Sequence, residues 1–455
     1  MKKIFILCLA LTLTVFTVKG ICADTDVKIK QLTADSKSHG LGIFDAWSGD
    51  DEWIVYACGP NHLNDLIEKV STKTGEIVTL YKIDNQTEYG PGCGTPSYCP
   101  TQDKVVFIHG PRNFGPDQKY EFWRRSAAVI REPDYNRPVF IDARDVTSPF
   151  TPGALRGGTH CHEWSHDGEW VAFTYNDMIM AELEKKTGRT LDLRTIGVSA
   201  NIKPVDVDED SAGENFDGEW FSVQLVEVVP DPEPGSDEIS RAYENCWVGY
   251  EGYTDKNGKT QRAVAFKGKV VDNTGREVPE IFIVDIPDDI QADSSAHPLE
   301  GTENKMPSPP LGTKWRRLTY TADRKYPGLT VDPRFWLRTS PKGDKIFFLA
   351  RDDNGINQIY YVLSLGGPIV QVTSQATDVM STPSISSDGG RICYICEGCV
   401  YVTEISGMRT FRVTNPAEKP ASSPIWSNSG DRIAFNRAVE GSGGRFLQIF
   451  ITEPF

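Results

Sequence analysis

Residues 151–177 read TPGALRGGTHCHEWSHDGEWVAFTYND, and this stretch decides the fold. Its second half runs from Trp164 through Ser-His-Asp-Gly into the alternating segment Trp170 to Tyr175. Asp and Gly suit a tight reversal that needs positive φ, and alternating apolar residues are typical of a half-buried strand. The stretch therefore predicts a strand, a tight turn and a second strand.

The same combination of a polar turn and a hydrophobic strand recurs along the chain. The late copies are 46 residues (339 to 385) and 41 residues (385 to 426) apart, which matches one four-stranded blade of a β-propeller. A degenerate copy without the turn signature lies near residues 244–285. Six blades is the alternative if residues 178–314 build one irregular blade, but we expect an all-β propeller with seven blades. The six plain copies start at Trp47, Tyr98, Trp164, Thr339, Ile385 and Trp426.

The two ends of the chain are expected to close the ring. The last copy ends after three strands at Phe455, and Lys28-Ile-Lys-Gln-Leu-Thr near the N-terminus matches the pattern of a fourth strand. Pairing the two would remove an exposed sheet edge. Residues 201–240 and 287–313 contain acidic and proline-rich stretches without periodicity, so we expect surface insertions there.

The first 23 residues have the form of a signal peptide, because two lysines precede an uncharged apolar run from Ile4 to Val18. This predicts a bacterial periplasmic or secreted protein, with residues 24–455 as a single propeller domain. Loss of residues 1–23 removes three lysines and moves the formal charge from −15 to −18. An acidic chain repels nucleic acid and anionic lipid, and no later segment is long and apolar enough to cross a bilayer. We expect a monomer that neither binds nucleic acid nor inserts into a membrane.

Eight cysteines follow residue 23, an even number that permits disulfides in an oxidising compartment without identifying the pairs. The spacing Cys393-x-x-Cys396-x-x-Cys399 begins on an apparent strand, where successive side chains point to opposite faces. We therefore expect buried thiols or one local disulfide there rather than a metal centre.

The repeats resemble those of TolB-like propellers, a bacterial exported class with WD40-like repeats. A closer resemblance, to an uncharacterised family of exported TolB-like proteins, covers most of residues 28–200. It implies the propeller fold and an exported location, and it brings no activity and no catalytic residues. The segments that carry it are Asn85-Gln-Thr-Glu-Tyr-Gly-Pro-Gly, Phe107-Ile-His-Gly, Asp142-Ala-Arg-Asp-Val, Phe150 to His160 and Phe173-Thr-Tyr-Asn-Asp.

The loops that enter the innermost strands open at one rim of a propeller channel, which is the usual ligand mouth. Two of these loops are rich in glycine, which either lets backbone amides approach a ligand or merely permits tight turns. The candidate ligand-binding residues are Tyr89, Arg156, Gly157, Gly158, His160, His162 and Arg338.

His160 and His162 stand two residues apart on an apparent strand, so we expect both to face the same way, as a metal pair requires. The pair resembles the channel histidines with which oligogalacturonate lyases, themselves propellers, hold a metal, although the surrounding residues do not match. Two other interpretations are open: hydrogen bonds that tie neighbouring inner strands together, and direct polar contact with a ligand. A third metal ligand would come from another segment, with the candidates Asp45, Glu163, His62 and His109.

Arginines near the inner strands, such as Arg144, Arg194, Arg334 and Arg338, suit acidic sugars or a peptide carboxylate if they face the channel. The alternative is that each pairs with a nearby acid such as Asp177. The sequence contains no Gly-x-Ser-x-Gly elbow and no phosphate loop.

These patterns favour an exported, non-catalytic propeller that binds a polypeptide or glycan at the mouth of its channel without a cofactor. The alternative is a metal-assisted lyase or hydrolase that acts on acidic oligosaccharides. In that case a divalent metal would be held by His160 and His162, and an arginine would hold the substrate carboxylate.

Overall fold

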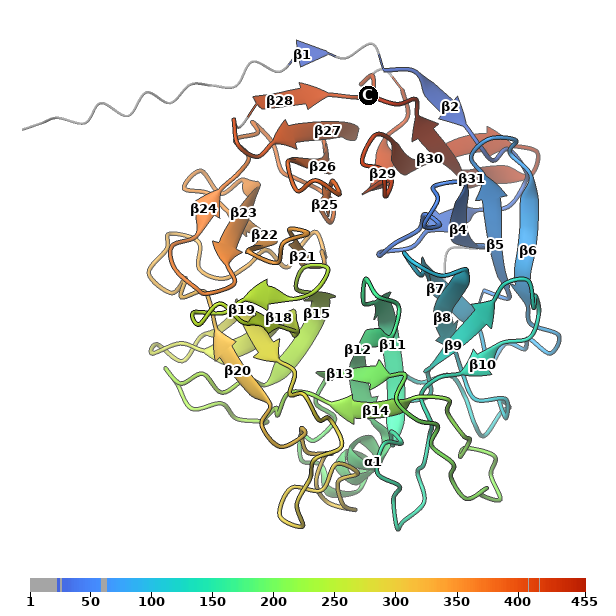
Figure 1. The fold of residues 1–455 in the computed structure, drawn as a ribbon, viewed down its shortest axis with the longest axis vertical. Helices are drawn as coiled ribbons and strands as arrows, with labels where there is room; N and C mark the ends of the chain where they lie inside the picture. Colours follow the sequence, from blue (N-terminus) through green and yellow to red (C-terminus); the bar gives the residue numbers. More distant parts are fainter. Residues whose placement is uncertain (1–22, 25–26, 59–63, 408, 417) are drawn as a thin grey trace, which may run out of the picture.

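The computed structural model describes residues 23–24, 27–58, 64–407, 409–416 and 418–455. Seven sheets, each built on four antiparallel strands, stand around a central axis like the blades of a propeller, and one of them gains a short fifth strand in parallel (Figure 1). The predicted all-β propeller with seven blades is confirmed. Six blades is wrong, because residues 178–314 contribute strands to two separate blades. The signal peptide stays a prediction, since residues 1–22 lie outside the described residues.

In the first six blades the four main strands follow the chain from the channel outward, and in blade 7 the outermost strand comes from the N-terminal part of the chain. Blade 1 contains β3 (His39–Leu41), β4 (Trp53–Cys58), β5 (Leu66–Ser71) and β6 (Ile77–Lys82). Blade 2 contains β7 (Cys93–Tyr98), β8 (Lys104–His109), β9 (Ser126–Arg131) and β10 (Val139–Phe140). Blade 3 contains β11 (Gly157–Trp164), β12 (Trp170–Asp177), β13 (Thr195–Ala200) and β14 (Phe221–Gln224). Blade 4 contains β15 (Arg241–Trp247), β18 (Ala263–Val271), β19 (Glu277–Asp285) and β20 (Lys314–Arg317), with a small hairpin of β16 (Tyr253–Thr254) and β17 (Thr260–Gln261).

The remaining three blades complete the ring. Blade 5 contains β21 (Arg338–Thr339), β22 (Lys345–Arg351), β23 (Asn357–Leu363) and β24 (Val370–Gln371). Blade 6 contains β25 (Ser384–Ile385), β26 (Arg391–Cys396), β27 (Cys399–Glu404) and β28 (Arg409–Arg412), and β1 (Ala23–Asp24) pairs with β28 in parallel. Blade 7 contains β29 (Ala421–Trp426), β30 (Ile433–Gly441), β31 (Gly444–Thr452) and, from the other end of the chain, β2 (Ile29–Gln31).

The pairing of β2 with β31 closes the ring as expected. The two strands are antiparallel, with Ile29 opposite Thr452 and Gln31 opposite Phe450. Without β2, the outer edge of β31 would be unpaired, and an unpaired edge is a template for association with other strands. Figure 1 shows β2, from the N-terminal part of the chain, beside the last strand β31 in this blade.

The serine of the repeat explains why the turn pattern recurs. In blade 3 the Ser165 hydroxyl accepts a hydrogen bond from the Trp170 amide at 3.0 Å and donates to Asp167 at 2.5 Å. The hydroxyl thus satisfies an amide at the start of the following strand, a local side-chain bond typical of serine in turns. The same bond from an amide five residues later, at 2.9–3.1 Å, is made by Ser48, Ser340, Ser386 and Ser427.

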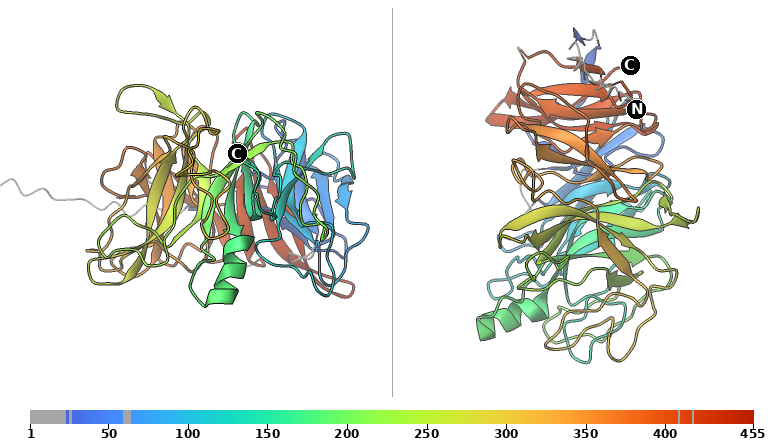
Figure 2. Two further views of the ribbon diagram at one scale, coloured as in Figure 1. Left: turned by 90° about the horizontal axis from the view of Figure 1, so that it is seen from below. Right: turned by 90° about the vertical axis from the view of Figure 1, so that its left-hand side faces the viewer.

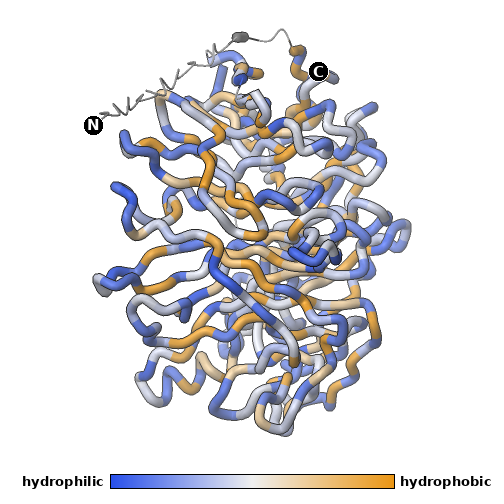
Figure 3. The backbone as a smooth tube through the Cα atoms, turned by 60° about the vertical axis from the view of Figure 1, so that its left-hand side comes forward, coloured by the Kyte–Doolittle hydropathy of each residue, from blue (hydrophilic) through white to orange (hydrophobic). Residues whose placement is uncertain are grey.

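The core lies between neighbouring blades. Val55 of blade 1 packs with Val105 and Phe107 of blade 2, and Val402 of blade 6 packs with Phe435 of blade 7. In Figure 3 many hydrophobic positions follow the strands, whereas the loops at the edges are largely hydrophilic. Burial of large side chains from facing sheets therefore holds the ring together.

Two long segments and one helix lie outside the blades. Residues 201–220 return to blade 2, where Trp220 forms a parallel bridge with Asp142. Residues 286–313 connect the third and fourth strands of blade 4. Helix α1 (Met178–Thr187), which stands out from one face of the ring (Figure 2), is capped by the Asp177 side chain and ends at Gly188 with φ of 69°. Among the described residues, no helix is long and apolar enough to span a membrane.

Candidate functional site

Arg156 has a clear structural role, and its predicted role in ligand binding stays a prediction without support from its contacts. Its side chain is fully buried, and its Nε and Nη2 atoms lie 3.1 and 2.9 Å from the Asp177 carboxylate. Its Nη1 and Nη2 atoms also donate to the carbonyls of Thr302 and Lys305 at 2.5 and 2.9 Å. Arg156 therefore anchors the segment 286–313 to blade 3.

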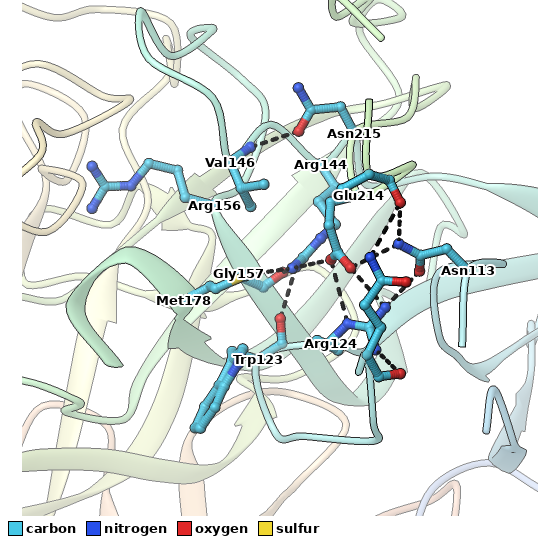
Figure 4. Close-up of polar contacts among 12 residues, drawn as sticks. Asn113, Trp123, Arg124, Arg144, Val146, Arg156, Gly157, Met178, Glu214 and Asn215 are labelled. Carbon is cyan, nitrogen blue, oxygen red and sulfur yellow. Dashed lines mark hydrogen bonds and ion pairs between the residues drawn. The ribbon is translucent and has the colours of Figure 1, made fainter. Parts of the chain in front are cut away.

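Arg144 is likewise committed to the fold, as Figure 4 shows. Its guanidinium donates to the carbonyls of Trp123 and Gly157, both at 2.7 Å, and pairs with Glu214 at 3.0 Å. Glu214 also pairs with Arg124 at 2.7 Å. A buried ion pair with this many hydrogen bonds fixes loop positions and leaves no charge free for a ligand.

Gly157 and Gly158 serve close packing of the backbone. A Cβ atom at Gly157 would lie 2.0 Å from the Asn176 carbonyl oxygen, and one at Gly158 would lie 2.3 Å from that of Phe122. Backbone atoms cannot yield as a flexible side chain does. Strand packing therefore explains why both positions need glycine. The structure gives no separate support for a role of these glycines in ligand binding.

A bulge in β11 separates the two histidines of the predicted metal pair. Between His160 and Glu163, β11 contains one residue more than its partner β12, and Cys161 takes a φ of 58°. One extra residue reverses the alternation of side chains, so Glu163, not His162, follows His160 on the same face. The expectation that both histidines face the same way is therefore wrong. Residues with positive φ also occur at the register shifts of three other innermost strands, at Thr95, Glu244 and Ser423.

Each histidine has its own hydroxyl partner. His160 Nδ1 is hydrogen bonded to Thr174, and His162 Nε2 lies 2.9 Å from the Thr159 hydroxyl, which donates to Asp142 at 2.5 Å. Burial lowers the pKa of His162 to about 3, so this ring is neutral at ordinary pH. The chain of bonds links blade 3 to the end of blade 2, which favours the tying role for His162.

The proposed third metal ligands do not gather around these histidines in the described part of the chain. No group of three His, Cys, Asp or Glu side chains there includes either ring. His109 is bonded through Nε2 to the Tyr81 hydroxyl at 2.9 Å, and His62 lies outside the described residues. Metal binding by His160 and His162 stays a prediction.

A cavity of about 730 Å³ occupies the channel, a size typical of small-ligand sites. Arg338 reaches into it and is held by the carbonyls of Leu337, at 2.8 Å, and Ile43. His166, which comes from the turn of blade 3, stacks on the ring of Tyr250 at 3.8 Å. The aromatic lining consists of Phe44, Trp164, Trp247, Tyr250, Trp336 and Trp426.

Two carboxyl groups, Asp45 and Glu163, face this cavity. Burial raises the pKa of Glu163 to about 8, against the opposing effect of Arg338, and the neighbouring Asp45 adds to the increase. Burial also raises the pKa of Asp45. A raised pKa favours the protonated form, in which a carboxyl group can donate a hydrogen bond, while Glu163 Oε2 accepts one from the Trp247 amide at 3.1 Å.

Four arginines, here called the arginine cluster, stand beside the cavity. Burial lowers the pKa of Arg194 to about 10, and the charges of Arg241, Arg125 and Arg334 contribute to the decrease. Arg125 and Arg194 lie on the same aromatic ring, with guanidinium carbons 4.9 and 5.7 Å from the centre of Phe122. Arg334 is the member of the cluster that also lines the cavity.

Three of these four arginines form no ion pair in the described residues. Arg125 donates through Nε to the Tyr120 hydroxyl, and Arg194 donates to the Asn176 amide oxygen at 2.9 Å. The Nε of Arg241 is buried without a hydrogen-bond partner. Arg334 is the member that has an acid, with Nε 2.6 Å from Glu244. Unpaired like charges in a chain of formal net charge −15 repel one another, and an anionic ligand would relieve that repulsion.

The remaining sequence candidates lie around this region. Tyr89 is half-exposed, and its carbonyl accepts a bond at 3.0 Å from the amide of Tyr120, the residue that meets Arg125. His160 is buried, and the charges of Arg194 and Arg125 add to burial in lowering its pKa. The structure therefore brings His160 to the arginine cluster, whereas Tyr89 is linked to it only through the Tyr120 backbone.

Sequence reasoning missed Arg125 and Arg241, which had no place in any motif. Arg125 ends the run Trp123-Arg-Arg before β9, and Arg241 opens β15 of the degenerate repeat. Only the strand topology indicates that these two arginines lie on the same face of the ring. In a propeller the second-to-third strand loops and the innermost strands begin on the same face, so arginines at both positions share that face.

All eight cysteines after residue 23 are buried thiols without a disulfide. Cys396 and Cys399 lie opposite each other across the turn between β26 and β27, and they belong to the same apolar cluster. The expectation of buried thiols at Cys393, Cys396 and Cys399 agrees with this arrangement.

Comparison with known proteins gives a family and a fold. The family model described as "Protein of unknown function (DUF3748)" matches residues 92–214. The protein called "Uncharacterized protein YidR" of Escherichia coli (strain K12) is 36% identical over 435 residues, covering 94% of this chain and 97% of the relative.

Two solved propellers are similar in structure. An oligogalacturonate lyase in complex with manganese has a TM-score of 0.54 at 12% identity, covering 96% of this chain and 98% of that chain. An oligogalacturonate lyase from Vibrio parahaemolyticus has a TM-score of 0.53 at 11% identity, covering 95% of each chain. At these identities the likeness shows the fold alone.

Proposed function

This chain belongs to the same family as the Escherichia coli protein YidR, and we propose that it binds an acidic glycan at the mouth of its channel. The family is the one that the sequence motifs indicate, with a TolB-like propeller. We further propose that the protein is exported and that binding, without catalysis, is its role.

The observation that carries the proposal is the arginine cluster. Arg125, Arg194 and Arg241 are partly or largely buried, repel one another and have no acid partner in the described residues. Guanidinium groups bind carboxylates in a planar, bidentate manner, and such charge-assisted bonds are about twice as strong as neutral ones. A ligand that carries several carboxylates would therefore gain affinity here.

Aromatic side chains favour a glycan over an acidic peptide. The ring of Phe122 is 51% exposed between two guanidinium groups, and Trp336 and Tyr250 line the adjoining cavity. Sugar rings present flat apolar faces that pack on aromatic rings. The carboxylates of an acidic sugar stacked in this way would then reach the neighbouring arginines. A polypeptide is the competing ligand, and the experiment below separates the two.

The test measures binding of oligogalacturonates, a neutral oligosaccharide of equal length and oligoglutamate by calorimetry at two salt concentrations. We expect binding of the acidic glycan alone, with affinity that falls as salt rises. Arg194→Gln should weaken it at least tenfold. The matched control is Arg409→Gln, because Arg409 is exposed on blade 6 and pairs with Glu404, away from the cavity. Preferred binding of oligoglutamate, or equal binding of the neutral sugar, would reject the glycan.

Metal-assisted cleavage of acidic oligosaccharides is the second proposal. The solved structures named as oligogalacturonate lyases support it only through the shared fold, and the bulge in β11 weakens it. This proposal makes two requirements. The wild type must bind a metal, and the double variant His160→Ala plus His162→Ala must lose that binding. The wild type must also release an unsaturated, ultraviolet-absorbing product from uronate oligosaccharides. A wild-type protein that yields no such product with added manganese is a binder.

A further inference from the structure

A cluster of possible metal ligands lies in blade 1, in residues that the binding proposal does not use. His39 opens β3, Cys58 ends β4 and Glu68 lies within β5. One ligand atom from each of the three lies within 4.8 Å of the other two, and all three residues are buried. His39 and Cys58 are direct cross-strand neighbours, so the sheet itself sets their spacing.

The imidazole of His39 lacks the hydrogen bonds that a buried polar group normally makes. The residue is 0% exposed, and neither ring nitrogen makes a hydrogen bond of regular geometry in the described residues, although the Leu447 backbone lies near the ring. Its Nε2 atom points toward acids, with Asp35 Oδ1 at 3.1 Å, although the geometry is not that of a hydrogen bond. Such a group costs free energy unless something binds it, so this ring indicates a missing ligand.

The chemistry of the donors suits zinc. Nitrogen, thiolate sulfur and carboxylate oxygen together are ligands of Zn²⁺, whereas Mg²⁺ and Ca²⁺ take oxygen ligands. The Cys58 thiol and the Tyr56 hydroxyl both lie 3.0 Å from Glu68 Oε2. Cysteine binds zinc as the thiolate, so metal binding would displace the Cys58 thiol proton that now faces Glu68.

A cation already meets these carboxylates. The Lys37 ammonium lies 2.8 and 3.0 Å from the two Glu68 oxygens and 3.5 Å from Asp35. Its side chain is 40% exposed, so it can turn into solvent when another cation replaces it. The acids are thus arranged around positive charge, and a divalent ion would satisfy them together with the unpartnered imidazole.

We propose that His39, Cys58 and Glu68 bind a zinc ion, with Asp35 as the fourth ligand, and that zinc replaces the Lys37 ammonium and the thiol proton of Cys58. The ammonium and the proton both leave to solvent, so the charges balance. The site lies beside the closure of the ring. The Gln448 amide of β31 donates to the carbonyls of Asp35 and Lys37 at 2.9 and 3.0 Å. The ion would therefore fasten blade 1 to the segment that arrives from blade 7.

The test is metal content and stability of the full chain, after equilibration with zinc and removal of excess. We expect one zinc per chain, and a lower unfolding temperature after a chelator removes it. Cobalt in place of zinc should give a thiolate-to-metal absorption band. Cys58→Ala should lose the zinc, the band and the chelator effect together. Cys93→Ala is the matched control, because Cys93 is an equally buried thiol in blade 2 and lies outside the cluster.

Lys37→Met separates the two cations. If zinc competes with the ammonium, this variant should bind zinc at least tenfold more tightly than the wild type and fold normally with it. Absence of zinc from both the wild type and Lys37→Met would overturn the proposal and leave Lys37 as the resident cation. Zinc that Cys58→Ala retains, or cobalt without a thiolate band, would also overturn it.

Discussion

Replacing Arg241 by Met should weaken ligand binding and stabilise the fold at once. The buried Nε of Arg241 has no partner in the described residues, and an unsatisfied buried donor costs about 1–3 kcal/mol. The guanidinium also stands among like charges, which Met removes while keeping a long unbranched side chain. Against this, Met does not reproduce the cation–π interaction with the Tyr243 ring, 4.8 Å away, which contributes about 0.5–1 kcal/mol. We therefore expect the free energy of unfolding to rise by about 1 kcal/mol.

The effect on binding has the opposite sign. A charge-assisted bond to a ligand carboxylate contributes about 1.5–3 kcal/mol, and partial exposure of Arg241 reduces this to about 1.4 kcal/mol, a tenfold loss of affinity. Thermal unfolding and calorimetric titration with a short oligogalacturonate measure the two quantities. Arg276→Met is the control, because Arg276 pairs with Asp272 at 2.7 Å on the surface of blade 4 and should leave binding unchanged. An Arg241→Met variant that binds normally and unfolds at a lower temperature would show that the residue serves the fold, and the reasoning would be refuted.

Two further variants probe the cavity and the close-packed glycine. The pKa of Glu163 rises from its ordinary value to about 8, so ionisation of this group destabilises the fold as pH increases from about 4.5 to 8. Glu163→Gln should therefore raise the unfolding temperature at pH 8 and leave it nearly unchanged at pH 4.5. An equal effect at both pH values would contradict the assignment. Gly158→Ala should destabilise the fold by about 1–3 kcal/mol, because the added Cβ atom would lie 2.3 Å from the Phe122 carbonyl oxygen. Gly115→Ala is the control: its added Cβ atom has no neighbour within 4 Å, so this variant should unfold as the wild type does.

The fold was accessible from sequence because the same local chemistry is repeated. Each plain copy needs a side chain that satisfies the next strand's first amides and residues that permit a tight reversal, and Ser165 with Asp167 and Gly168 shows how this works. Six repetitions of one weak signal make a strong one. Ring closure by β2 followed from the same pattern, since the N-terminal segment matched the fourth strand that the last copy lacked.

The candidate site was less accessible, because its geometry depends on departures from regular strand structure. Nothing in the residue types around Cys161 predicts the positive φ that turns His162 away from His160, and Glu244 and Thr95 adopt the same conformation with quite different side chains. Contacts between distant segments are equally hidden. Arg156 looked available in a glycine-rich loop, but the carbonyls of Thr302 and Lys305 that bury it belong to blade 4.

These departures also indicate where function should be sought in such a ring. What every blade shares, such as the serine bond and the interleaved apolar strands, is explained by closure of the propeller and needs no ligand. Arg125 and Arg241 belong to no repeated feature of the blades, and neither has an acid partner in the described residues; Arg241, like His39 of blade 1, also has a buried nitrogen without a regular hydrogen bond. The Nε of the buried Arg144 also lacks a partner, but its guanidinium has an acid, Glu214, and three further acceptors. What distinguishes Arg241 is the lack of an acid partner in the described residues, and this favours an anionic ligand.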